Sequence, residues 1–140
     1  MNILFVCEGN INRSQMAGAF LHKLLPNVTV STAGTLVPPE HEGKHTREVS
    51  TKGIEVMQEI GLDMRDATMH RLTPAMVDAA DRVILVGPTP GGPLPEFLSE
   101  SSKLEMWNVP DPGYGFISHT AARDSILEHI QQLVHELEVS

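Results

Sequence analysis

Short apolar runs alternate along the chain with segments whose apolar residues recur every three or four positions. The runs suit buried strands, and the spaced patterns suit helices with one apolar face. The expected strands are residues 2–6, 28–31, 82–86 and 104–109. The expected helices are residues 14–25, 48–60, 73–80 and 118–138. This alternation predicts an α/β fold of three layers, in which helices cover both faces of a mostly parallel, four-stranded sheet.

Local signals mark the ends of the two central helices. Val49, Val56, Met57 and Ile60 form the apolar face expected for residues 48–60, and Gly61 is a typical helix end. Thr73 followed by Pro74 is the start signal of the shorter helix at 73–80. Residues 87–95, rich in Gly and Pro, are expected to form a loop without regular structure.

Length, composition and charge narrow the class of protein. With 140 residues, 41% of them apolar, the sequence predicts a single globular domain over residues 1–140. It has no apolar run long enough for a membrane helix and no basic, apolar leader, so we expect a cytoplasmic protein that does not bind membranes. The formal net charge of −8 makes nucleic acid a poor partner, and any anion site must be built locally.

The only cysteine, Cys7, directly follows the first expected strand. A lone cysteine cannot form an internal disulfide and is either a small buried side chain or a reactive thiol. Ligands of open parallel sheets bind beyond the carboxyl ends of the strands, which is where the first strand delivers Cys7. The position therefore favours a functional thiol.

The residues after Cys7 form a candidate phosphate-binding loop. Its members are Glu8, Gly9, Asn10, Ile11, Asn12, Arg13 and Ser14. A loop of this size between a strand and a helix can direct successive N–H groups at one anion, and the helix N-terminus adds its dipole. Arg13 can bind two phosphate oxygens with its planar guanidinium. The same positive potential should favour the thiolate form of Cys7, which is a competent nucleophile.

Here the chain resembles the low-molecular-weight protein tyrosine phosphatases and the thioredoxin-coupled type of arsenate reductase that shares their fold. Four segments carry the resemblance. They are residues 6–17 (VCEGNINRSQMA), 31–35 (STAGT), 55–63 (EVMQEIGLD) and 107–112 (WNVPDP).

The resemblance implies a phosphomonoesterase that acts through a phosphocysteine, with Cys7 as the nucleophile and Arg13 stabilising the charge on the phosphoryl group. Asp111 would be the general acid, aimed from its loop with the help of Pro112. Ser14 would donate a hydrogen bond to the thiolate. No metal ion and no cofactor are implied, and the substrate would be a phosphorylated protein or a small phosphate or oxyanion.

The chain also departs from the family's pattern. Glu8 brings a negative charge to a position that faces the ligand in the family, and Asn12 stands where the loop often has a second cysteine. The walls of a substrate groove are expected from Tyr114 and, opposite it, from Pro38, Pro39 and His41.

Two other functions stay open. An arsenate reductase would use the same Cys7 but would need an external thiol, because the chain has no further cysteine. A phosphocarrier or anion-binding module would keep the loop for recognition alone, although such a protein would have no use for a proton donor at Asp111.

Overall fold

The computed structural model describes residues 1–139, and four strands in this range form one sheet. The strands are β1 (Asn2–Cys7), β2 (Thr29–Gly34), β3 (Arg82–Val86) and β4 (Leu104–Trp107). Their order is β2-β1-β3-β4, and every neighbouring pair is parallel. The predicted α/β class and parallel sheet are therefore confirmed, with β1 in a central position.

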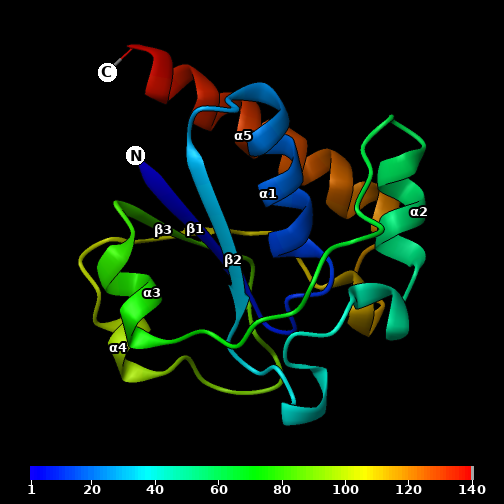
Figure 1. Cartoon of the computed structure of the whole chain (residues 1–140), viewed down its shortest axis with the longest axis horizontal. Coiled ribbons are helices and arrows are strands. Elements are labelled where there is room, and N and C mark those ends of the chain that lie inside the picture. Colours follow the sequence, from blue (N-terminus) through cyan, green and yellow to red (C-terminus); the bar gives the residue numbers. More distant parts are fainter. Residues whose placement is uncertain (140) are drawn as a thin grey trace.

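Helices cover both faces of this sheet, as the sequence predicts (Figure 1). The α-helices are α1 (Arg13–Leu24), α2 (Lys52–Gln58), α3 (Pro74–Ala79), α4 (Glu96–Ser99) and α5 (His119–Val139). Three short 3-10 helices are η1 (Pro39–His41), η2 (Thr46–Glu48) and η3 (Pro112–Tyr114). Helices α1, α2 and α5 pack on one face, and α3 and α4 pack on the other.

The two faces of β1 explain why its sequence is apolar throughout. Ile3 and Phe5 point into the core beneath α1 and α5, whereas Leu4 and Val6 point into the core beneath α3 and α4. All four side chains are fully buried. Successive residues of a strand face opposite sides, so a strand covered on both faces needs apolar residues at every position.

One helix prediction needs correction, and one helix was missed. The helix expected at 48–60 begins only at Lys52, because the chain first makes the 3-10 turn η2 and ties Thr46 N–H to the carbonyl of Ala67. The helix also ends at Gln58, before Ile60. Val49 and Ile60, expected on the apolar face, therefore lie outside α2 and are 42% and 44% exposed. Helix α4 was not predicted, since four residues are too few to show a helical period.

The carboxyl ends of the parallel strands meet at one edge of the sheet. Cys7 ends β1, Gly87 follows β3 at once, and residues 108–111 follow β4. This edge is where open α/β sheets place their ligands. Among residues 1–139, no helix has both the length and the apolar character to cross a membrane.

Candidate active site

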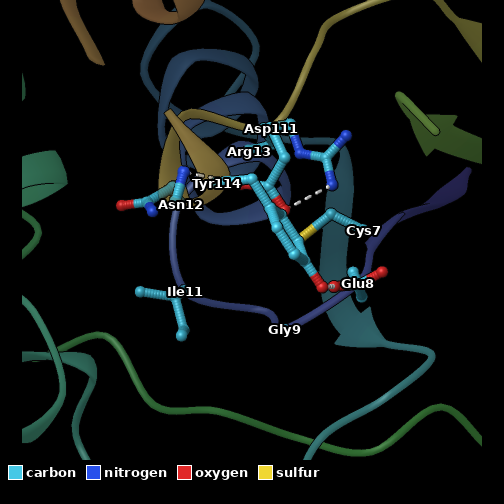
Figure 2. Close-up of a pocket in the computed structure, with 9 residues that line it drawn as sticks. Cys7, Glu8, Gly9, Ile11, Asn12, Arg13, Asp111 and Tyr114 are labelled. Carbon is cyan, nitrogen blue, oxygen red and sulfur yellow. Dashed lines mark hydrogen bonds and ion pairs between the residues drawn. The ribbon is translucent and has the colours of Figure 1, made fainter. Parts of the chain in front are cut away.

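A pocket of about 200 Å³ lies at this edge of the sheet, at the turn from β1 into α1 (Figure 2). Its lining comes from the loop after β1 and from the segment after β4. The lining residues are Cys7, Glu8, Gly9, Ile11, Asn12, Arg13, Asp111, Gly113 and Tyr114. Two segments about a hundred residues apart in the sequence thus form one pocket.

The Cys7 side chain is held by a short hydrogen-bonded chain inside the loop. Its Sγ lies 3.0 Å from the Oγ of Ser14, and Asn10 Nδ2 donates to the same Oγ at 2.7 Å. Because the Ser14 oxygen already accepts from Asn10, its own hydrogen is left to point toward the sulfur. Asn10 and Ser14 are fully buried and support the loop from beneath the pocket.

Asn10 has a second structural role, which the sequence alone did not reveal. Its φ of 56° is left-handed, which asparagine tolerates better than most residues. Its Oδ1 accepts from His70 N–H at 2.8 Å, and its carbonyl accepts from Gln15 Nε2 at 3.0 Å. Gln15 also donates to the carbonyl of Thr68 at 2.7 Å. These contacts anchor the loop to the segment at 68–70.

Arg13 opens α1 and is almost wholly buried, with 1% of its surface exposed. Its Nη1 donates to the carbonyls of Pro88 at 3.0 Å and Val109 at 2.9 Å. Its Nη2 donates to Asp111 Oδ2 at 3.1 Å. Main-chain carbonyls from two other loops therefore fix the guanidinium against the pocket, so little side-chain entropy is left to lose when an anion binds.

Asp111 reaches the pocket from the segment after β4, where it begins the turn η3. Oδ1 accepts from Gly113 N–H at 2.8 Å, and Oδ2 accepts from Arg13. Only 14% of the side chain is exposed. The carboxyl group is thus held in one orientation beside the guanidinium, as Figure 2 shows.

Gly87 makes the close approach behind Arg13 possible, which yields a first prediction. Its φ is +99°, and a Cβ there would collide with the Val109 carbonyl and with Arg13 Nη1. Gly87→Ala should therefore displace the guanidinium and weaken phosphate binding by roughly tenfold or more, as expected for a lost charged hydrogen bond. Phosphate affinity measured by calorimetry checks this.

Gly61→Ala is the matched control for Gly87→Ala. Gly61 also has a positive φ, +82°, but an added Cβ would meet nothing within 4 Å. Both variants carry the backbone strain, about 1–3 kcal/mol each, and only Gly87→Ala disturbs Arg13. Equal phosphate affinities in the two variants would contradict the steric argument.

Glu8 is buried, and its carboxylate joins three parts of the site. Oε1 accepts from Gly91 N–H at 2.6 Å, and Oε2 accepts from the Tyr114 hydroxyl at 2.6 Å. The hydrogen bond to Glu8 is the main cause that raises the pKa of the Tyr114 hydroxyl. Glu8 thereby connects the loop after β1 to the Gly- and Pro-rich loop at 87–95 and to η3.

The structure places the predicted site residues together around Cys7, either in the pocket lining or, for Asn10 and Ser14, directly beneath it. The wall expected opposite Tyr114 is wrong, because the residues proposed for it are absent from the lining: Pro38, Pro39 and His41. Gly91, in the loop at 87–95, lies close to the Tyr114 hydroxyl and donates its N–H to Glu8. Among the described residues, no group of three or more His, Cys, Asp or Glu side chains is arranged to hold a metal ion.

Known proteins show the same fold and similar sequences. The family model of the low molecular weight phosphotyrosine protein phosphatases matches residues 2–140. A probable low molecular weight protein-tyrosine-phosphatase, EpsP of Ralstonia solanacearum, is 35% identical over 85 residues; this match spans 61% of the chain and about half, 54%, of that relative. Arsenate reductase 2 of Staphylococcus haemolyticus is 28% identical over 130 residues, which is 92% of each chain.

Among solved structures, Wzb of Vibrio vulnificus in complex with benzylphosphonate has a TM-score of 0.78 and 26% identity, covering 96% of this chain and 97% of that one. The chain belongs to the low molecular weight phosphotyrosine protein phosphatase family. The resemblance drawn from the sequence is thereby confirmed, together with the prediction of an enzyme of the cysteine phosphatase type. Arsenate reductases are also among its relatives.

Proposed function

We propose that this protein hydrolyses phosphate monoesters through a phosphocysteine formed on Cys7. The observation that carries the proposal is the convergence, in one pocket, of a hydrogen-bonded thiol, a fixed guanidinium and a carboxyl group. These are a nucleophile, a group that stabilises the phosphoryl oxygens, and a proton donor.

In the first step the Cys7 thiolate attacks phosphorus, so that an S–P bond forms while the ester P–O bond breaks. Asp111 gives its proton to the leaving oxygen, which departs as an alcohol or phenol. Arg13 and the N–H groups of the loop bind the three equatorial oxygens as charge spreads over them. The Ser14 hydroxyl, which lies 3.0 Å from the sulfur, stabilises the thiolate before the attack.

In the second step water attacks phosphorus and the S–P bond breaks. Asp111, now a carboxylate, takes the proton of this water, inorganic phosphate leaves, and the thiolate is restored. In the structure the Arg13 guanidinium pairs with Asp111 at 3.1 Å, and a bound phosphoryl group would compete with Asp111 for it. This competition releases the Asp111 carboxyl group from Arg13, so that it can reach the leaving oxygen and then the water.

The substrate is proposed to be a phosphorylated protein or a small phosphate ester, and the location is proposed to be the cytoplasm, where thiols stay reduced. A lone Cys7 has no second thiol in the chain that could protect it by a disulfide. Cys7 can therefore act as a thiolate nucleophile only in a compartment that keeps thiols reduced.

Arsenate reduction is the second candidate, because arsenate reductases match over 92% of the chain. Cys7 would attack arsenic and displace water. An external thiol would then attack the Cys7 sulfur, the S–As electron pair would stay on arsenic as arsenite leaves, and a second thiol would release Cys7 from the mixed disulfide. The external thiol is required because Cys7 is the single cysteine of the sequence.

Parallel assays of the protein test the two candidates. Hydrolysis of p-nitrophenyl phosphate is expected, whereas arsenate with glutathione or a dithiol should give little arsenite. Efficient arsenite production without ester hydrolysis would reverse the ranking, and inactivity toward both substrates would refute the proposed phosphatase.

A further inference from the structure

Glu8 places a negative charge inside a pocket that is proposed to bind phosphate. Only 7% of the residue is exposed, and it shares the lining with Cys7 and Arg13. Both of its carboxylate oxygens accept hydrogen bonds, from Gly91 N–H and from the Tyr114 hydroxyl. Two donors stabilise a carboxylate and fix its position.

The negative charge of Glu8 disfavours the binding of anions in the pocket. Arg13 is the only cationic side chain in the lining, and it already faces the Asp111 carboxylate. Charges a few ångströms apart in a partly buried pocket are poorly screened by salt, so Glu8 repels a second anion near the phosphate and attracts a cation there.

One aromatic side chain, Tyr114, lines the pocket beside Glu8 and stacks on Phe116. The rings of Tyr114 and Phe116 are stacked, with centroids 5.6 Å apart and planes within 6°. Tyr114 is 49% exposed and Phe116 is 64% exposed, so both rings present apolar surface to solvent. The hydroxyl of Tyr114 donates to Glu8, so the Tyr114 ring has a negatively charged carboxylate at its polar end (Figure 2).

The geometry points to Glu8 as a specificity-determining residue. It selects phosphate esters whose leaving group carries a cationic or hydrogen-bond-donating substituent near the phosphate, and it rejects esters with a second anionic group there. This inference rests on the proposed function for its physiological meaning, although binding measurements test it without any turnover.

The experiment measures the affinity of the wild-type protein and of Glu8→Gln for three probes by calorimetry. The probes are benzylphosphonate and its derivatives with a meta-carboxymethyl or a meta-aminomethyl group. The wild-type protein should bind the aminomethyl probe more tightly than the carboxymethyl probe. Glu8→Gln, which keeps an oxygen to accept from Gly91, should reduce this affinity ratio by about tenfold.

Two matched variants separate charge from structure. Glu40→Gln removes an equal charge from the exposed helix η1, outside the pocket lining, and should leave the ratio unchanged. Tyr114→Phe removes the hydroxyl that donates to Glu8 but leaves the carboxylate, so the preference for the aminomethyl probe should persist.

Several outcomes would overturn the assignment. The wild-type protein could bind none of the probes, or could fail to prefer the aminomethyl probe. The ratio of the affinities for the aminomethyl and carboxymethyl probes could also change equally in Glu8→Gln and Glu40→Gln. Loss of the preference in Tyr114→Phe would assign it to the hydrogen bond, not to the charge, and would also overturn it. Should Glu8→Gln fail to fold, a wild-type protein that does not prefer the aminomethyl probe would still overturn the assignment.

Hydrolysis of p-nitrophenyl phosphate, measured alongside, keeps the two proposals apart. Selective binding without hydrolysis would refute the phosphatase while supporting the role of Glu8 in a binding pocket. Hydrolysis with unselective binding would refute the role of Glu8 alone.

Discussion

Cys7→Ser is expected to lower the hydrolysis of aryl phosphates by on the order of 10⁴-fold or more. A serine hydroxyl stays protonated at neutral pH, and in the first step Asp111 acts as an acid and so cannot take the serine proton. Ser14 Oγ already accepts from Asn10, and the Asp111 carboxyl is turned toward Arg13 and Gly113. The variant therefore keeps the pocket but loses the nucleophile. Steady-state kinetics with p-nitrophenyl phosphate measures the loss.

Phosphate affinity provides the control for Cys7→Ser. The loop N–H groups and the Arg13 guanidinium, held by the carbonyls of Pro88 and Val109, do not depend on the sulfur. The variant should therefore still bind phosphate, and its unfolding midpoint in denaturant should stay close to that of the wild type. A variant that retained more than about one hundredth of the wild-type rate would contradict nucleophilic attack by Cys7.

A second experiment, rapid quenching of the wild-type reaction, tests for the phosphocysteine intermediate. Phosphate attached to Cys7 should accumulate only transiently and disappear as inorganic phosphate is released. A long-lived phosphocysteine that passes its phosphate to another protein would indicate a phosphocarrier in place of a phosphatase.

The parts of the site that the sequence predicts are those built from neighbouring residues. Cys7, the loop, Arg13 and Ser14 lie within eight consecutive positions between a recognisable strand and a recognisable helix. Their contacts, such as that of Cys7 Sγ with Ser14 Oγ, are consequences of how such a loop must curl. Asp111 lies far along the chain and was found only through the resemblance of residues 107–112 to a known family.

The sequence could not predict the contacts between distant loops. Glu8 bonds to Gly91 and Tyr114, which are 83 and 106 positions away, and nothing in the local pattern of residues 87–95 indicates that they meet. Gly87 looks like an ordinary loop glycine, although its lack of a side chain lets Arg13 and the Val109 carbonyl come together behind it. Such contacts depend on which strand ends are neighbours, and the strand order is a tertiary property.

The assignment of the proton donor is decided by Asp111→Asn, which should lower turnover by about 10²–10⁴-fold for an ester whose leaving group is a poor one. The substitution preserves shape, because an asparagine oxygen can still accept from Gly113 N–H or from Arg13 Nη2. What it removes is the proton that the leaving oxygen needs.

The size of the loss should depend on the leaving group. Phenyl phosphate, which leaves as a strongly basic phenolate, should suffer the full loss in Asp111→Asn, whereas p-nitrophenyl phosphate should suffer less, since its phenolate is stable without a proton. Asp78 is an exposed residue of α3 outside the pocket. Asp78→Asn makes the same chemical change and should leave both rates intact.

If Asp111→Asn hydrolysed phenyl phosphate at the wild-type rate, the proton would have to come from elsewhere, and the carboxyl group would only orient Arg13 through their 3.1 Å contact. Equal losses for the two esters would likewise favour the orienting role, because the position of Arg13 affects every phosphoryl group alike, whereas protonation matters in proportion to the basicity of the oxygen that leaves.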